Sequence, residues 1–520
     1  MSELLLRLDT TLGHEAGPVP ADLAEGFASD GAPLVLQHDP ILASLPPPPP
    51  APAPEFDWGQ ALASLHNALS DAVPLLQWFF LLYFVAYNGS YILLNLRSLF
   101  SLLRYRREQE VAMPGDGEAR DEVPISLIVP VCNQASAAVA AVHAMRHLDY
   151  SAFEIIIVND GSDDETLDVL LREFSLVPFP EAYRDRLQTR HVKSVYASTE
   201  YPNLRLVDKE KGGRADAINA AINCARYPLY CGVDVEYVLQ RDSLRKMARP
   251  FADNPLAVAA CSATGAANGA VTKDGFIDRI GLPRNMLVLF QIVEQLRAFL
   301  PGRAWWSDIN AMLVFPGAFA IFRKEAVVAA GAYRTDVADA EMELLVRLHR
   351  LARQAKAPYR ITLVPDTVCW AAVPEKMHTQ KNRQIQCQRA LHESLKLNLR
   401  LLFSRTGGAA GALAFPFVLL FEWLGPLVEL LGYVAMTALW MFGAISLEAF
   451  WTFMLLAIGL GMLLSVSGLA LDEMSSRTYP RLGSVFKLFA AALLENFGYR
   501  QLNAFWRLTG LLRSRTNIAA

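Results

Sequence analysis

Two short apolar runs decide the fold of this chain: Ile125-Ser-Leu-Ile-Val-Pro130 and Glu154-Ile-Ile-Ile-Val-Asn159. Runs of this length that are rich in β-branched residues are typical of buried strands. Between them, residues 136–148 favour a helix with Ser136 as its N-cap. A strand, a helix and a second strand in so short a segment predict a βαβ unit, and such a unit requires parallel strands.

The same pattern returns further along the chain. It predicts a strand at Leu204-Arg-Leu-Val207, a helix from Arg214 to Arg226, and another strand at Leu229-Tyr-Cys-Gly-Val233. The sequence therefore predicts an α/β domain with a mostly parallel sheet over residues 121–400.

Polar side chains follow three of these strands at the point where each strand ends. The clusters are Val131-Cys-Asn-Gln134, Asn159-Asp-Gly-Ser-Asp163 and Asp234-Val-Glu236. Asp-Gly-Ser by itself is a common turn. Ligands of open parallel sheets, however, bind beyond the carboxyl ends of the strands. Three polar clusters at successive strand ends therefore indicate a ligand site.

The composition points to a membrane. Apolar residues make up 53% of the 520 residues and charged residues only 19%, against about 25% charged residues in average soluble chains. The net charge of −4 argues against a nucleic-acid partner. The six cysteines form no C-x-x-C pair, which excludes a disulfide scaffold and a zinc ribbon and favours reduced thiols in a cytosolic domain.

The N-terminal part of the chain divides into a tail, a span and a linker. Residues 1–71 are acidic and proline-rich and are expected to be mostly disordered, with a short helix near Trp58 to Leu69 and no signal-peptide pattern. Residues 72–96 carry no charge over 25 positions, which is enough to span a bilayer. The linker 97–120 opens with arginines. Positive residues next to a span stay on the cytoplasmic side, so we expect the N-terminal tail outside and the following domain in the cytoplasm. The membrane is expected to be the inner membrane of the cell.

Hydropathy returns after the α/β domain, over residues 405–520. We expect a multi-pass membrane protein whose C-terminal region holds an interfacial helix at 409–422, spans near 425–447 and 449–471, and interfacial helices at 484–513. The last segment is apolar but carries Lys487, Glu495, Arg500, Arg507 and Arg513. The alternative for 484–505 is a third C-terminal span.

The order and spacing of the motifs resemble the membrane-bound family 2 glycosyltransferases, which have the GT-A fold and include polysaccharide synthases. The matching stretches are Val129-Pro-Val-Cys-Asn133 for V-P-x-Y-N, Val158-Asn-Asp-Gly-Ser162 for V-D-D-G-S, Gly212-Gly-Arg-Ala-Asp-Ala-Ile-Asn219 for G-G-K-A-D-A-L-N, and Asp234-Val-Glu236 in place of D-x-D. Residues 290–299 and 316–323 resemble the acceptor side of such proteins, and Glu341 falls in the catalytic-base motif.

The resemblance implies a site and a reaction. The nucleotide-binding residues would be Pro130, Asn133, Asp160, Gly161, Ser162, Arg214 and Asp234, with Asp160 at the uracil base. Asp234 and Glu236 would hold a Mg²⁺ or Mn²⁺ ion on the donor's phosphates. Glu341, with Asp339 as its rival, would take a proton from the acceptor hydroxyl. The function implied is inverting transfer from a nucleotide-diphosphate sugar, a UDP-sugar, to a polysaccharide or glycolipid at the lipid bilayer.

The motifs depart from the family at several functional positions. Arg214 replaces lysine, Glu236 replaces aspartate, and Ala340-Glu341 stands for E-D. The Q-x-x-R-W motif reads Gln384-Ile-Gln-Cys-Gln388, so its arginine and tryptophan are missing. Arg383 or Arg389, beside Gln384, could complete a donor and acceptor clamp, or both could be ordinary solvated charges. The alternative function is therefore a pseudo-glycosyltransferase acting as a partner or regulator of envelope polysaccharide machinery.

Overall fold

The structure is a computed structural model that describes residues 58–111, 122–179, 186–299, 302–315, 319–403, 407–475, 479 and 482–512. Residues 1–57, which we expect to be mostly disordered, lie outside the described residues. So do residues 112–121, which include the end of the predicted linker. The chain divides into two compact units, Met1–Leu65 and His66–Ala520. The second unit holds the sheet and the site.

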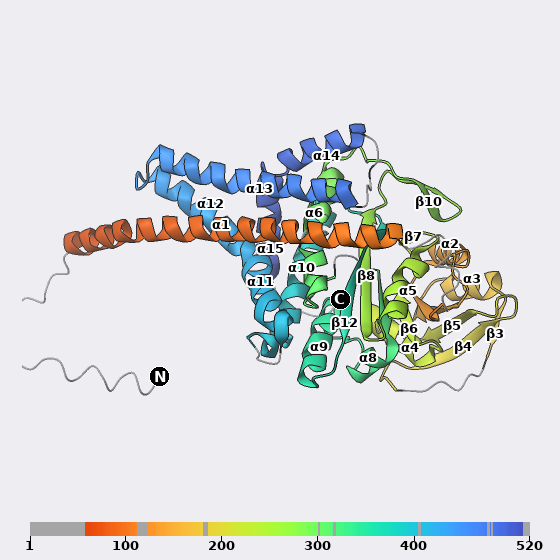
Figure 1. Cartoon of the computed structure of the whole chain (residues 1–520). Helices are drawn as coiled ribbons and strands as arrows, with labels where there is room; N and C mark the ends of the chain where they lie inside the picture. Colours follow the sequence, from red (N-terminus) through yellow and green to blue (C-terminus); the bar gives the residue numbers. More distant parts are fainter. Residues whose placement is uncertain are drawn as a thin grey trace, which may run out of the picture. The chain divides into compact units, whose positions relative to one another are not determined.

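The described residues include one ten-stranded sheet (Figure 1). Its strand order is β3 (Leu176–Pro178), β4 (Val192–Ser198), β5 (Leu204–Lys209), β2 (Phe153–Asp160), β1 (Ile125–Val131), β6 (Leu229–Gly232), β11 (Ala320–Arg323), β8 (Ala257–Ala266), β12 (Arg360–Ala371) and β7 (Val238–Leu239). The central run β5-β2-β1-β6 is parallel, as the βαβ pattern predicted. Antiparallel strands flank this run, and a separate hairpin pairs β9 (Val271–Lys273) with β10 (Phe276–Arg279).

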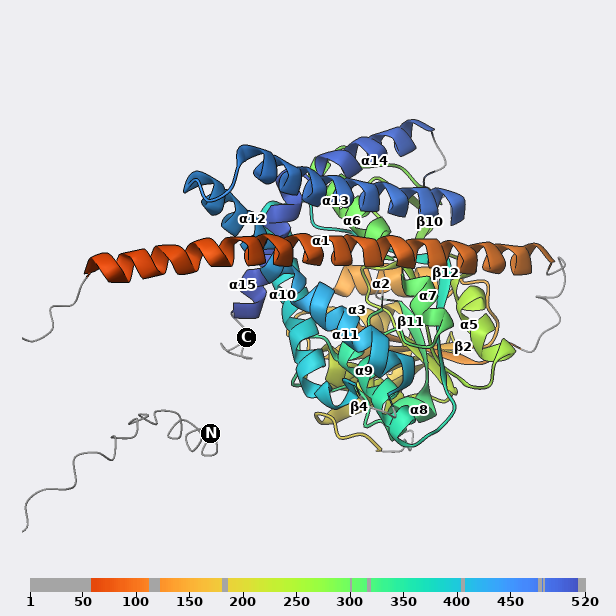
Figure 2. The same ribbon diagram turned by 60° about the vertical axis from the view of Figure 1, so that its left-hand side comes forward.

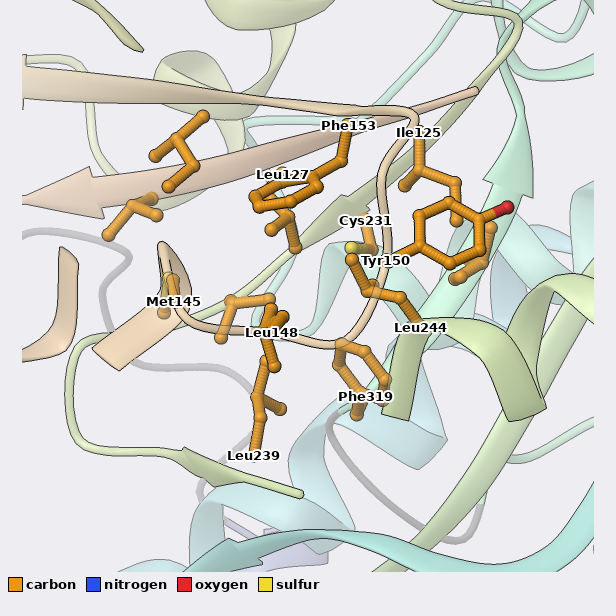
Figure 3. Packing of buried hydrophobic residues seen from close by; sticks show 14 of the residues in the cluster. Ile125, Leu127, Met145, Leu148, Tyr150, Phe153, Cys231, Leu239, Leu244 and Phe319 are labelled. Carbon is orange, nitrogen blue, oxygen red and sulfur yellow. The ribbon is translucent and has the colours of Figure 1, made fainter. Parts of the chain in front are cut away.

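Helices cover both faces of the sheet. One face packs on α2 (Ala135–Met145), α3 (Thr166–Glu173) and α5 (Ser243–Asp253), and the other on α4 (Arg214–Cys224), α7 (Arg303–Asp308), α8 (Lys324–Ala329) and α9 (Ala340–Gln354). Alternate residues of β1 therefore enter opposite cores. Ile125 and Leu127 belong to the cluster in Figure 3, together with Phe153 of β2, whereas Ile128 belongs to the cluster on the other face.

The start of α2 differs from the prediction. Its N-cap is Gln134 rather than Ser136, and no side chain caps it. The backbone N–H of Gln134 donates to Thr166 Oγ1 at 3.1 Å, at the start of α3. This tertiary bond fixes the loop after β1, so the helix begins earlier than the local serine signal indicates.

The helix that contains the predicted N-terminal span is much longer than the span. α1 runs from Trp58 to Val111, and its Asp71–Arg107 part is long and apolar enough to cross a membrane. It therefore includes the end of the expected tail and the first half of the expected linker. Residues 97–111 contain no Gly or Pro and are rich in Leu, Arg, Glu and Gln, so nothing in them stops the helix.

The C-terminal helices follow the predicted order with different bounds. α13 (Leu447–Ser475) contains the candidate span Leu447–Glu473. α12 (Gly425–Met441) qualifies only together with the segment 410–423, at a 42° bend, so the described residues hold two candidate spans, or three with this pair. That segment consists of two π-helical turns, η3 (Ala410–Ala414) and η4 (Val418–Trp423), around α11 (Phe415–Phe417). It contains Pro416, which lacks an N–H for a regular helix.

α13 lies along α1 in both views (Figures 1 and 2). Asn95 Nδ2 of α1 donates to Ser467 Oγ of α13 at 2.6 Å. Two charges of the segment that we predict to lie at the membrane interface pair with other helices. Arg500 of α15 (Tyr499–Leu512) binds Glu429 of α12 at 2.9 Å, and Glu495, just after α14 (Leu482–Leu494), binds Arg297 at 2.6 Å. Arg297 belongs to α6 (Met286–Phe299). These pairs tie the last helices to the rest of the domain.

Candidate active site

The predicted polar loops meet at one edge of the sheet. The parallel register places Val131 beside Asn159, and Asp160 beside Lys209. The backbone N–H of Asn133 donates to Ser162 Oγ at 3.0 Å, and Asn133 Oδ1 accepts from the N–H of Asp163 at 2.9 Å. The loops after β1 and β2 are therefore joined directly, next to Pro130 in β1, as the rule for strand ends predicted.

Asp160 anchors the glycine loop. Its Oδ1 accepts from Lys209 Nζ at 2.7 Å and from the N–H of Gly212 at 2.9 Å, and its Oδ2 accepts from the N–H of Gly213 at 2.7 Å. The side chain is nearly buried, and Lys209 is also paired with Asp216 at 2.6 Å. Both carboxylate oxygens hold the loop, so Asp160 positions the glycine loop, and its contact with the uracil base stays a prediction.

The sequence left Lys209 unassigned. A lysine with no exposed side chain at the end of a buried strand needs a carboxylate partner, and Asp160 is its neighbour on β2. The position after Asp160, Gly161, requires glycine for two reasons. Its φ is +61°, and a Cβ there would lie 2.6 Å from the backbone nitrogen of Lys211.

Arg214 brings together carboxylates that are far apart in the sequence. It is the first residue of α4, and its Nε donates to Asp234 Oδ1 at 2.8 Å. Its Nη1 donates to Glu341 Oε1 at 3.2 Å. The structure thus gathers the residues that resemble the lysine of G-G-K, the first aspartate of D-x-D and the catalytic base around one guanidinium.

The two candidate bases have different surroundings. Asp339 is the N-cap of α9, and its Oδ1 accepts from the N–H groups of Glu341 and Met342, each at 3.0 Å. Glu341 points to Arg214 instead. Burial raises the pKa of the Glu341 carboxyl from 4.5 to about 7, with Arg214 opposing the rise and Asp339 and Asp234 adding to it. Glu341 is therefore a carboxylate whose pKa suits proton transfer near neutral pH.

A cavity of about 910 Å³ lies at this position. Six of the predicted site residues line it: Arg214, Asp234, Asp339, Glu341, Arg383 and Gln384. The joined loops with Pro130, Asn133, Asp160, Gly161 and Ser162 lie outside its lining, at the edge of the sheet. Glu236 is exposed and Arg389 pairs with Glu393 at 3.7 Å, and neither lines the cavity.

The carboxylates at this site fit the binding of a divalent cation only in part. Within the described ranges, no group of three His, Cys, Asp or Glu side chains is arranged to hold a metal. Asp234 lines the cavity and uses Oδ1 for Arg214. Mg²⁺ at nucleotide sites is commonly bound through one or two carboxylates together with substrate phosphates and water. Asp234 fits that mode, whereas Glu236 does not face the cavity.

Two further residues of the cavity, Glu294 and Arg507, were not among the predicted site residues. Glu294 of α6 accepts from Gln384 Nε2 at 3.2 Å and from Asn503 Nδ2 at 2.8 Å. Arg507 of α15 donates from Nε to Gln388 Oε1 at 2.8 Å. Glu294 lies in the stretch that resembles an acceptor side, which was a usable signal. Nothing local marked Arg507, because its place depends on how α15 packs on α10 (Met377–Leu397).

Comparison with known proteins supports the assignment of the domain. The model of glycosyl transferase family 2 matches residues 126–327. A poly-β-1,6-N-acetyl-D-glucosamine synthase of Staphylococcus epidermidis is 24% identical over 272 residues, 52% of this chain and 55% of the relative. The synthase of that name in Staphylococcus aureus strain COL is 26% identical over 258 residues, 49% of this chain and 51% of the relative. The chain spans about half the length of these curated relatives.

Two solved structures are among those to which the chain is similar. A mannosyltransferase, PcManGT from Pyrobaculum calidifontis, in complex with GDP-Man and Mn²⁺, is 19% identical with a TM-score of 0.48 and covers 82% of this chain and 99% of its own. The TarS 1–349 fragment of S. aureus in complex with UDP is 13% identical with a TM-score of 0.35, covering 73% and 92%. The family match and the motifs agree, and residues 126–327 of this chain are similar to glycosyl transferase family 2, with the mostly parallel sheet that the GT-A resemblance implied.

Proposed function

We propose that this protein is a membrane glycosyltransferase that moves a sugar from a UDP-sugar to a polysaccharide or glycolipid acceptor with inversion. The observation that carries the proposal is the arrangement around Arg214, which places Asp234 and Glu341 on the wall of one cavity. The names of the curated relatives make UDP-N-acetylglucosamine the first donor to test.

The residues of this chain divide the chemistry between them. Glu341 takes the proton of the acceptor hydroxyl as that oxygen bonds to the anomeric carbon of the donor. The bond from this carbon to the β-phosphate oxygen breaks with its electron pair, and UDP leaves. Arg214 supplies a positive charge beside the departing diphosphate. A Mg²⁺ or Mn²⁺ ion bound through Asp234 would supply further stabilisation of the phosphate charge.

The first test is release of UDP by the purified full chain from UDP-N-acetylglucosamine with Mn²⁺ or Mg²⁺, followed by a panel of other UDP-sugars. If the wild-type protein releases more UDP than the Glu341→Gln variant, the result supports an enzyme. UDP binding with no release from any donor supports the alternative, a pseudo-glycosyltransferase that acts in envelope polysaccharide assembly. The specific observation behind this alternative is Gln388, which is buried where the family motif has tryptophan.

Asp234→Asn is expected to weaken the Mn²⁺-dependent part of UDP binding by at least roughly 10- to 100-fold, because loss of an outer partner of a metal site already costs that much and Asp234 is proposed as a direct ligand. The reason is that Asp234 is the motif carboxylate that lines the cavity. Calorimetric titration of UDP with and without Mn²⁺ measures this. Glu236→Gln is the second arm. Equal losses in both variants would return Glu236 to the metal site, and no loss in Asp234→Asn would remove Asp234 from it.

We also propose that the protein lies in an inner membrane with its tail outside and its α/β domain in the cytoplasm. The arginines after the span support this sidedness, because positive residues stay cytoplasmic. A topology reporter fused at residue 50 should behave as external, and one fused at residue 520 as cytoplasmic. An external signal at 520 would instead mean that residues 484–505 form a third C-terminal span.

A further inference from the structure

Arg507 is a fixed cation in the wall of the cavity. Its Nε donates to Gln388 Oε1 at 2.8 Å, and its Nη2 donates to the carbonyl oxygen of Glu422 at 2.7 Å. Both acceptors are neutral. Among the residues that the structure describes, no carboxylate oxygen pairs with this guanidinium within 4.0 Å. The charge of Arg507 is therefore held in place without being neutralised.

The other cations of the cavity differ from Arg507. Arg214 is paired with both Asp234 and Glu341. Arg383 is exposed. Arg507 alone among the arginines of the lining combines a fixed guanidinium with neutral partners, and Gln388, which holds it, is 1% exposed. Arg507 lines the cavity, so the N–H groups that it does not use for Gln388 and Glu422 can donate to a molecule bound there.

The packing of α15 on α10 places Arg507 at this site. Gly510 lies one turn further along α15, and a Cβ there would be 2.8 Å from the carbonyl oxygen of Ile385 and 3.2 Å from Gln388 Cβ. The missing side chain lets the two helices approach closely. The Arg500–Glu429 pair attaches the start of α15 to α12. The position of Arg507 therefore also depends on two contacts of α15 that do not involve Arg507 itself, the close approach at Gly510 and the Arg500–Glu429 pair.

The chemistry of this wall matches a saccharide. Together with Arg507, the cavity is lined by Gln384, Gln386 and Gln388 of α10 and by Glu294 of α6. Sugar hydroxyls both donate and accept hydrogen bonds, so they are recognised by guanidinium donors set among amide and carboxylate acceptors. The residues at the sheet edge, which we assign to the donor, are on other elements.

We propose that Arg507 is an acceptor-binding residue that holds a hydroxyl of the terminal saccharide of the acceptor. Gln388, which follows Cys387 on α10, holds this guanidinium in place. This inference rests on the proposed function, since it presupposes that the cavity receives an acceptor. It adds a C-terminal helix to the site.

Arg507→Gln in the full chain tests this. The probe is a β-1,6-linked N-acetylglucosamine oligosaccharide, and the readouts are its affinity, the affinity for UDP, and the partition of UDP-N-acetylglucosamine between transfer and hydrolysis. Loss of hydrogen bonds from a charged donor predicts roughly 10- to 100-fold weaker oligosaccharide binding. UDP affinity and hydrolysis are expected to stay within about twofold, because the donor residues lie on other elements.

Two further variants separate recognition from folding. Cys387→Arg in the Arg507→Gln background returns a guanidinium to the cavity from α10 and should recover part of the oligosaccharide affinity. Lys396→Gln removes an exposed charge from α10 outside the cavity lining and should change nothing. Normal oligosaccharide binding by Arg507→Gln would overturn the proposal. So would a parallel loss of UDP affinity, or a wild-type protein that does not bind the oligosaccharide.

These outcomes also separate this inference from the proposed function. Oligosaccharide binding that depends on Arg507, in a protein that transfers no sugar, supports the inference and contradicts the transferase. Transfer that is unchanged in Arg507→Gln supports the transferase and contradicts the inference.

Discussion

Glu341→Gln is expected to lower sugar transfer by roughly 10²- to 10⁴-fold, the usual contribution of a general base, while UDP affinity stays that of the wild type. The substitution keeps the shape of the side chain and removes its basicity. Glu341 hydrogen-bonds to Arg214 in the cavity, and Asp234 is held by a different nitrogen of the same guanidinium, so the donor side keeps its anchor. Transfer to an oligosaccharide and UDP titration measure the two effects separately.

The matched control is Asp339→Asn. Asparagine caps a helix as well as aspartate, so α9 should keep its start at Ala340 and transfer should persist. Full transfer by Glu341→Gln together with loss in Asp339→Asn would move the base to Asp339.

The pH dependence follows from the raised pKa of Glu341. A base must be deprotonated to act, and burial brings the pKa of this carboxyl to about 7. Transfer should therefore increase with pH up to and through about 7. The stabilising effect of the protonated group is complete below pH 4.5 and is lost as the pH rises through about 7. At pH 8 the melting temperature of Glu341→Gln should consequently be no lower than that of the wild type, which excludes unfolding as the cause of its inactivity.

Asp160→Ala is expected to destabilise the domain by about 3 kcal/mol, the lower end of the cost of breaking a buried ion pair. Lys209 would remain buried but would keep Asp216 as a partner, which is why we expect the lower end. The N–H groups of Gly212 and Gly213 would lose their acceptor, so the loop before Arg214 would no longer be held. UDP affinity should fall with it.

Thermal melting and UDP titration check this prediction, with Asp163→Asn as the control. Asp163 follows the same strand, is exposed, and contributes its backbone rather than its side chain to the loop contact with Asn133. Asp163→Asn should match the wild type. A folded Asp160→Ala protein with unchanged UDP affinity would remove Asp160 and its loop from the donor site.

The sequence by itself determined the centre of the fold. Ile125 and Glu154 open strands that the structure places side by side and parallel, because a β-branched run has few alternatives to a buried strand. The sequence also determined that the polar loops after β1 and β2 meet, since parallel strands present their carboxyl ends at one edge. The candidate span could be predicted for a similar reason: an uncharged stretch of sufficient length is a local property.

Only the tertiary structure decided the roles of individual site residues. The sequence did not show that Asp160 also holds the glycine loop, a role set by Lys209 on the neighbouring strand and by the N–H groups of Gly212 and Gly213. The structure distinguishes Glu341 from Asp339, because Asp339 caps α9 whereas burial raises the pKa of Glu341. Arg507 lines the cavity because α15 packs against α10. Hydrogen-bond partners and pKa values depend on distances between residues far apart in the chain, and packing of whole elements sets those distances.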